Sequence, residues 1–423
     1  MTEPLDPRQR RLRLIAFSLL ASAFMVAFFH RVAPTVIVDQ LRQDLNASAV
    51  ALGWLGAVYF YVYTAMQIPA GIMADRYGPR LTVAGGCLVA AGGSLLFAAA
   101  GGLLAADAGR LLVGLGVSTA FVGLMKFNAN WFDARQYARM AGVVILIGNA
   151  GAVLGVSPLA RLLNWVDWRE AFVGLALISL LLAVAIFLVV RDRPASAAPD
   201  HGTTDATPRE PWWSSLAAVA GNRALWPHFT GLFAVVGSFF AFSGLWAVPM
   251  FHDVFALDRT SASDYVTLSL VAFALGSFAA GWLSDRLGRR KPVIVAAAVL
   301  SLLTYLYTWL GPWVPGASAW WLFLAHGLCP AGMVVCYTAA KESVSFRHTG
   351  MAIALVNTGL FLGAAVLQPA FGWLLESQAV GDMLQHADYR RGLALLCVVN
   401  LVGLSATLLG RETGGLGYRD DPA

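Results

Sequence analysis

Two basic side chains stand inside apolar stretches of the sequence, where a charge is costly if the stretches span a membrane. Arg31 follows Phe28 and His30 near the end of the first apolar stretch. Lys126 lies sixteen residues beyond Arg110 in a later stretch, which corresponds to about 24 Å of helix. Insertion scales put the cost of a charged residue at the centre of a membrane helix at roughly 2.5 to 3.5 kcal/mol. Each cation therefore requires a partner, a hydrated cavity or a function.

Acidic residues that would neutralise these cations are missing from the same depth. None of the 24 Asp and Glu lies in the middle third of an apolar stretch, and Asp39, Asp253 and Glu342 are among those close to the ends. An uncompensated guanidinium in a low-dielectric cavity is unfavourable, whereas a carboxylate matches its planar fork with two hydrogen bonds. We therefore expect a small anionic substrate, and a carboxylate in preference to a cationic drug.

Further polar residues could line the same cavity. Tyr59, Tyr63 and Gln67 recur at steps of four, which places them along one face of a helix. This stripe is typical of either substrate lining or aromatic packing between helices, and the sequence leaves both open. Asn149 and Asn357 stand in two later apolar stretches, where each is either a substrate contact or a hydrogen-bonded packing residue.

The composition indicates that membrane-spanning helices position these residues. Hydrophobic residues make up 58% of the 423 residues, charged residues only 13%, and the mean hydropathy is +0.67. A helix needs about 20 apolar residues to cross the hydrocarbon of a bilayer. Twelve such stretches occur, at residues 14–38, 50–74, 81–101, 110–131, 140–162, 171–190, 228–251, 265–284, 292–311, 318–341, 350–373 and 391–410. We therefore predict an all-α membrane protein with twelve transmembrane helices.

The distribution of basic residues predicts the orientation. An even number of spans puts both termini on one side, and 20 Lys and Arg lie in or beside the connections on that side, against seven on the other. Cytoplasmic connections carry the excess of basic residues, so we expect a protein of the bacterial inner membrane with both termini cytoplasmic. The net charge of +5 is accounted for in this way, without a nucleic-acid partner.

A charged decapeptide occurs twice and indicates a duplication. Gly71-Ile-Met-Ala-Asp-Arg-Tyr-Gly-Pro-Arg80 is matched 210 residues later by Gly281-Trp-Leu-Ser-Asp-Arg-Leu-Gly-Arg-Arg290. Internal repeats of this kind mark repeated structural units. Between the halves, residues 191–227 form a polar, proline-bearing stretch that ends in a short interfacial helix. We predict two pseudo-symmetric six-helix bundles, residues 1–190 and 228–423, joined by a cytoplasmic linker at 191–227.

The repeated pattern G-x-x-x-D-R-x-G-x-R resembles the signature loop of the major facilitator superfamily, which lies between the second and third helices and returns more weakly between the eighth and ninth. The resemblance implies the major facilitator fold, with transport by alternating access. Arg110-Leu-Leu-Val-Gly-Leu-Gly116 resembles the family's second common motif, although an interfacial arginine beside small packing residues is an equally good interpretation. A gating role without substrate contact is implied for the loop residues Gly71, Asp75, Arg76, Gly78, Arg80, Asp285 and Arg286.

Within that superfamily, the surroundings of the two cations resemble the anion:cation symporter branch. That branch has an acid-Arg pair in its first helix and a basic residue shortly before Trp-Phe in its fourth. Here the corresponding residues are His30-Arg31 and Lys126, which lies six residues before Phe132. The resemblance implies that Arg31 and Lys126 hold the anion and that Tyr63 donates a hydrogen bond. His30 replaces the acid that carries the coupled proton, and because histidine titrates near neutrality it is the candidate for proton coupling.

Other functions fit the sequence less well. The organophosphate antiporter branch also has an arginine at the position of Arg31, but it adds a lysine where this chain has Gln67, and an arginine in helix 7 that has no counterpart here. An exporter of amphipathic or siderophore-like compounds, an anion exchanger and a ligand-binding membrane sensor remain alternatives. No enzyme motif or metal-ligand cluster occurs, and the four cysteines have unrelated spacings. We expect no enzymatic activity, cofactor or metal, and a functional monomer.

Overall fold

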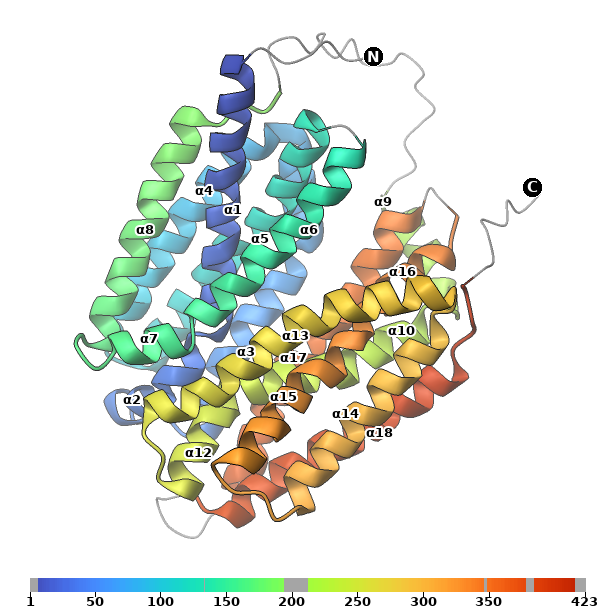
Figure 1. The fold of residues 1–423 in the computed structure, drawn as a ribbon. Helices are drawn as coiled ribbons and strands as arrows, with labels where there is room; N and C mark the ends of the chain where they lie inside the picture. Colours follow the sequence, from blue (N-terminus) through green and yellow to red (C-terminus); the bar gives the residue numbers. More distant parts are fainter. Residues whose placement is uncertain (1–6, 133, 194–211, 346–347, 378–383, 415–423) are drawn as a thin grey trace. The chain divides into compact units, whose positions relative to one another are not determined.

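The part of the chain that the structure describes is helical throughout (Figure 1). The computed structural model describes residues 7–132, 134–193, 212–345, 348–377 and 384–414. Within these ranges, eleven helices are long and apolar enough to cross a membrane, and the shorter apolar helix α3 (Ala49–Ala65) completes the series. The prediction of an all-α protein with twelve membrane helices agrees with this arrangement.

The chain divides into two compact units. Unit 1 comprises residues 1–33 and 62–209, and unit 2 comprises residues 34–61 and 210–423. Residues 34–61 come from the first half of the sequence but pack with the second half. Two six-helix bundles at residues 1–190 and 228–423 stay a prediction. Residues 194–211 of the predicted linker lie outside the described residues. The short helix expected at the end of the linker is present as α9 (Trp212–Gly221).

Unit 1 is a bundle in which a long helical hairpin packs against neighbouring helices. Its helices are α1 (Pro7–Val32), α4 (Gln67–Ala98), α5 (Leu103–Trp131), α6 (Ala134–Leu154), α7 (Ser157–Leu162) and α8 (Trp168–Val189). α4 lies against α5 and α8, whereas α1 lies against α5 and α6. α1 and α5 are antiparallel, because Phe24 packs on Phe121 and Phe17 packs on Phe132, with ring centroids 5.3 and 6.2 Å apart.

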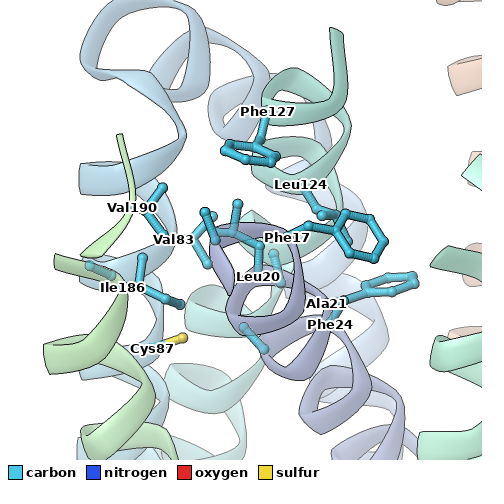
Figure 2. Close-up of a cluster of buried hydrophobic side chains, with 14 of the residues drawn as sticks. Phe17, Leu20, Ala21, Phe24, Val83, Cys87, Leu124, Phe127, Ile186 and Val190 are labelled. Atoms are coloured by element: carbon cyan, nitrogen blue, oxygen red, sulfur yellow. The ribbon is translucent and has the colours of Figure 1, made fainter. Parts of the chain in front are cut away.

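The core of unit 1 is a cluster of aliphatic and aromatic side chains from five helices, α1, α4, α5, α6 and α8 (Figure 2). Its buried members include Phe17, Leu20 and Phe24 of α1, Val83 and Cys87 of α4, Leu124 and Phe127 of α5, and Ile186 of α8. Lipid tails are as apolar as these side chains, so helices in a bilayer associate through close van der Waals packing more than through the hydrophobic effect. This packing holds α1, whose last turn carries Arg31.

Glycines allow α4 and α5 to approach closely. A side-chain carbon at Gly93 would lie 2.6 Å from the backbone nitrogen of Val113, and one at Gly109 would lie 2.7 Å from the backbone nitrogen of Phe97. Neither backbone can yield easily, so both positions require a residue without a side chain. Small residues at helix contacts are the usual means of close approach in membranes.

Unit 2 combines the second half of the chain with α2 (Pro34–Asp44) and the first part of α3. α2 packs against η2 and α12, and α13 packs against α15. The further α-helices of unit 2 are α10 (Trp226–Gly231), α11 (Gly237–Ala241), α12 (Ala247–Phe255), α13 (Arg259–Leu287), α14 (Lys291–Leu310), α15 (Ala317–Ala331), α16 (Val335–Glu342), α17 (Thr349–Glu376) and α18 (His386–Leu409). Two π-helical turns, η1 (Leu232–Val236) and η2 (Phe242–Trp246), and one 3-10 turn, η3 (Gly332–Val334), join them.

Several spans are interrupted at identifiable residues. The fifth span breaks between α6 and α7, just before Pro158. The tenth span changes to the 3-10 turn η3 two residues after Pro330, since proline removes a helical hydrogen bond. Gly78 has φ 78° and ψ 164° and divides α4 into two helices. This conformation has a positive φ, which glycine adopts at little cost.

Candidate functional site

Arg31 lies in the last turn of α1 and is almost completely buried, with 5% of its surface exposed. Its guanidinium carbon is 4.1 Å from the centre of the Phe28 ring and 5.4 Å from the centre of the Tyr63 ring. Phe28 is one helical turn before Arg31, so the ring and the guanidinium share one face of α1. Stacking on aromatic faces stabilises a cation and fixes the plane of its hydrogen-bonding fork.

The predicted polar stripe near Arg31 is divided between two helices. Tyr63 belongs to α3 and is buried, whereas Gln67 begins α4 and is half-buried. The chain stays near helical geometry between them, with Met66 at φ −80° and ψ −6°. Tyr59 is buried in unit 2, where its ring packs on Phe60 with centroids 5.4 Å apart. Of the three stripe residues, Tyr63 is therefore the one that the structure brings to Arg31.

His30 points into the packing of unit 1. Its imidazole Nε2 lies 3.4 Å from the Ser94 hydroxyl, and its ring lies 6.0 Å from the Phe172 ring, measured between centroids. The His30 carbonyl accepts a hydrogen bond from Arg110 Nη1 at 2.9 Å. The imidazole thus contacts α4 and α8, while the neighbouring guanidinium of Arg31 lies over Tyr63. This agrees with the expectation that adjacent helical positions face different directions.

Arg110 is a residue near the site that the sequence analysis did not include among the candidates. Only 1% of its surface is exposed, which removes the interpretation of an arginine reaching the membrane surface. Its hydrogen bond to the carbonyl of His30 holds the end of α1 against α5. The motif-like stretch from Arg110 to Gly116 is the sequence feature that could have indicated Arg110 as a candidate.

Lys126 has a protein carboxylate as its partner, contrary to expectation. Its ammonium nitrogen is 2.6 Å from Asp75 Oδ1, with 35% and 70% of the two side chains exposed. The expectation that no protein acid neutralises Lys126 was therefore wrong. Asp75 was overlooked because it was assigned to a loop, but α5 continues only five residues beyond Lys126, so this lysine lies near the same end of the bundle as the loop.

Arg31 and Lys126 lie at different depths of unit 1. The ring contacts between the antiparallel helices place Lys126 level with about residue 21 of α1. Arg31 is ten residues farther along α1, or about 15 Å. The pairing with Asp75 also directs the Lys126 ammonium toward the signature loop. In this structure one carboxylate cannot contact both cations, so the predicted two-cation clamp would require either a longer anion or a movement of Lys126.

The two predicted asparagines belong to different units. Asn149 lies on α6 in unit 1, is half-buried, and donates a hydrogen bond to the carbonyl of Ile145 at 2.9 Å. Asn357 lies on α17 in unit 2 and accepts a hydrogen bond from the Tyr337 hydroxyl at 2.8 Å. Each amide therefore has a local partner, as expected for a buried polar residue, and each keeps further hydrogen-bonding capacity.

The first signature loop closes against the end of α8. The backbone nitrogen of Arg80 donates to Asp192 Oδ1 at 2.8 Å, and Arg80 Nε donates to the carbonyl of Phe187 at 2.6 Å. Gly78 needs its positive φ to make the turn. Gly71 faces open space, and Arg76 lies over the Tyr77 ring at 5.6 Å. The predicted gating residues thus form a compact turn in which Asp75 is the one that binds Lys126.

The second signature loop has different partners. Asp285 Oδ1 is 2.6 Å from Arg290 Nη1, and the same guanidinium binds Glu342 at 3.0 Å. Arg286 lies over the Trp282 ring at 5.3 Å. Glu412 accepts the backbone N–H of Arg290 at 2.7 Å and ties the chain after α18 to this loop. The repeated sequence therefore gives two charged turns whose aspartates bind different cations.

Comparison with known proteins supplies the family. The model of the Major Facilitator Superfamily matches residues 17–262 and 246–417. The fold is similar to that of a bacterial homologue of the human lysosomal transporter Spinster, crystallised inward-facing and unoccupied. Its TM-score is 0.78 at 16% identity, covering 96% of this chain and 98% of that one. A likeness at this identity concerns the fold alone.

Three relatives are similar over large parts of the chain. A protein of Cupriavidus necator named as a probable sulfoacetate transporter is 22% identical over 88% of this chain and 89% of its own length. A probable L-galactonate transporter of Escherichia coli is 24% identical over 66% of this chain and 63% of its own length. An MFS-type efflux pump of Mycolicibacterium smegmatis is 28% identical over 72% of this chain and 70% of its own length. The chain thus spans less than two thirds of the L-galactonate protein.

Proposed function

This chain belongs to the Major Facilitator Superfamily, and we propose that it transports a small organic anion, specifically a carboxylate. The proposed transport crosses the bacterial inner membrane and works by alternating access. The chain is a transporter and not an enzyme. Proton coupling, a functional monomer and cytoplasmic termini belong to the same proposal.

The observation that carries this proposal is the placement of Arg31. Its buried guanidinium is held between two aromatic rings, at 4.1 and 5.4 Å from their centres, inside a membrane bundle. A planar cation whose orientation is fixed in this way matches a carboxylate through two parallel hydrogen bonds. Two relatives are named as probable transporters of sulfoacetate and of L-galactonate, which are both organic anions, and this supports the same ligand class.

The second cation enters the proposal in a different role from the one first expected. Lys126 is bound to Asp75 here, so it serves the anion only when that ion pair opens. Both side chains are partly exposed, and exposed ion pairs contribute only about 0 to 1 kcal/mol. An arriving anion could therefore displace Asp75 at small cost. Arg31 is the principal anion-binding residue and Lys126 an auxiliary one.

Proton coupling through His30 stays a proposal. The imidazole is enclosed by Ser94 and Phe172, with the guanidinium of Arg110 bound to the carbonyl of the same residue. A second positive charge beside Arg110 would be repelled in a medium of low dielectric constant. His30 can therefore carry the coupled proton only if the end of α1 rearranges during transport.

Ligand stabilisation of the purified protein tests the anion proposal directly. Galactonate and sulfoacetate should raise the melting temperature of the wild type, whereas an uncharged sugar should not. Arg31→Ala should abolish the shift, and Arg31→Lys should weaken carboxylate binding by about tenfold, because lysine lacks the planar fork. Arg161→Ala, which removes an exposed arginine of α7, is the matched control and should behave as wild type.

Two outcomes would contradict the proposal. One is a sugar or a cationic compound that stabilises the protein regardless of Arg31, and the other is a carboxylate shift that survives Arg31→Ala. The relative named as an efflux pump favours export as the second candidate. Uptake into proteoliposomes with an imposed pH gradient separates the two, because an importer coupled to protons accumulates the anion when the outside is acidic.

A further inference from the structure

A cluster of ionisable side chains lies in unit 2 where α2 packs against α12. The imidazole Nδ1 of His252 is 3.8 Å from Asp39 Oδ2 and 3.3 Å from Asp253 Oδ1. The other oxygen of Asp253 accepts a hydrogen bond from the Tyr389 hydroxyl at 2.7 Å and lies 3.6 Å from Arg42 Nη1. We call these five residues the α2–α12 cluster.

The two carboxylates of the cluster have different surroundings. Asp253 is 10% exposed, and one of its oxygens accepts a hydrogen bond from a hydroxyl and pairs with a guanidinium. Asp39 is 21% exposed, and the imidazole at 3.8 Å is beyond hydrogen-bond distance. Burial raises the pKa of Asp39, and the Asp253 carboxylate raises it further, against the opposing effect of His252 and nearby arginines. Its surroundings therefore favour the protonated form of Asp39 relative to an ordinary carboxyl group.

The charged groups around Asp39 come from each helix near it. α12 contributes His252 and Asp253, α2 itself contributes Arg42, and α13 contributes Arg259. Tyr389 of α18 completes the set through Asp253, while η2 has no ionisable side chain. The positive charges of Arg42 and Arg259 already neutralise the negative charges of the two carboxylates. The cluster is therefore better able to bind a proton than a divalent cation.

The α2–α12 cluster lies where a segment from the first half of the sequence packs within unit 2. α2 and the first part of α3 leave unit 1 after Ala33 and return to it at Val62, yet they pack within unit 2. The cluster therefore holds a segment from the first half of the repeat against helices of the second half. If α2 separated from α12, Asp39 would become hydrated and would return to an ordinary carboxylate pKa of about 3.9.

We propose that the carboxyl of Asp39 is a proton-binding site that controls the docking of α2 on α12. This inference depends on the proposed function at one point, because it treats the docking of α2 on α12 as a step of alternating access. Because the pKa of Asp39 is raised in the docked state, docking is strongest below the ordinary carboxylate pKa, where Asp39 is protonated in both states. Docking weakens as the pH rises through the raised pKa.

Distance measurements between spin labels test this inference without any substrate. One spin label is placed on α2 with Gln43→Cys, and the other with Val314→Cys. Val314 follows Trp313, whose ring packs on α12, so the distance between the labels reports on docking. Both labelled positions are exposed. The full-length protein is reconstituted in lipid nanodiscs, with its four native cysteines replaced by alanine and a chelator present. Pulsed EPR then gives the docked fraction at each pH.

The docked fraction of the wild type should fall several-fold as the pH rises from about 4, near the ordinary carboxylate pKa, to neutrality. Asp39→Asn should remain docked throughout, because the amide imitates the protonated acid. Asp44→Asn, an exposed acid on the same helix, is the matched control and should follow the wild type. A wild-type distance that is independent of pH, a docked fraction that rises with pH, or an Asp39→Asn variant that titrates like the wild type would overturn the proposal. Failure of anion binding at Arg31 would produce none of these results, because no anion is present.

Discussion

At the scale of single residues, Arg110 should contribute most to the stability of unit 1 among its basic side chains. It is 1% exposed and donates a hydrogen bond of 2.9 Å to the His30 carbonyl. Arg110→Ala removes this bond and leaves a cavity, so we expect a loss of about 2 to 4 kcal/mol in the free energy of unfolding. Unfolding of the detergent-solubilised protein by a denaturing detergent measures the loss. Arg161→Ala, at an exposed position of α7, should change it by less than about 0.5 kcal/mol, and equal effects of both substitutions would contradict this assignment.

The residues at the site show where sequence reasoning is strong and where it stops. Arg31 could be identified because a charge within an apolar stretch is conspicuous without any knowledge of its neighbours, and it is indeed buried. The Asp75 partner of Lys126 could not, since the two are 51 residues apart and only the folded hairpin of α4 and α5 brings them together. Hydropathy reports the depth of a residue but not which distant side chain reaches it.

At the scale of secondary-structure elements, the contact between α4 and α5 depends on the face that each glycine presents. Gly92 and Gly93 are neighbours on α4, but a side chain at Gly92 would meet open space, whereas one at Gly93 would meet the α5 backbone at 2.6 Å. We expect Gly93→Ala to destabilise unit 1 by about 1 to 3 kcal/mol, as overpacking does. Gly92→Ala should be neutral or stabilising by up to about 1 kcal/mol, because alanine favours helix. The melting temperatures of the two variants test this prediction. A similar decrease in both would contradict the close contact of α4 with α5 at Gly93.

The elements themselves were predictable to different degrees. Apolar length alone gave the spans, since crossing a bilayer sets a minimum for every helix. Pro158 at the start of α7 and Gly78 of the first signature loop both stand at helix breaks, as expected of residues that disrupt or relax helical geometry. The two π-helical turns at Leu232 and Phe242 had no such signal, because each occurs inside a continuous apolar run of helix-compatible residues. Such turns depend on packing against neighbouring helices, which a single sequence does not reveal.

At the scale of the whole molecule, the duplicated sequence does not produce two equivalent halves. Each signature loop has an aspartate, yet Asp75 binds a lysine of α5 and Asp285 binds the arginine at the end of its own loop. Residues 34–61 depart further from the repeat, since they leave the first half and pack with the second. An internal repeat therefore predicted the helix order but not the assignment of this segment. Under the alternating access proposed above, this segment, which packs with the opposite half, is the one to be released.

Release of this segment gives a last prediction, for the contact of α3 with α17. A side-chain carbon at Gly53 would lie 2.7 Å from the backbone oxygen of Gln368 and from the Cα of Pro369. Gly53→Val should prevent residues 34–61 from packing on α17 and so reduce transport in proteoliposomes by at least about tenfold, since a transporter held in one state completes no cycle. Carboxylate binding should survive, because Arg31 and its aromatic partners belong to unit 1. Gly174→Val, where nothing lies within 4 Å, is the matched control and should transport normally. Normal transport by Gly53→Val would mean that the packing of α3 on α17 is no part of the cycle, whereas loss of binding together with transport would place the defect in folding.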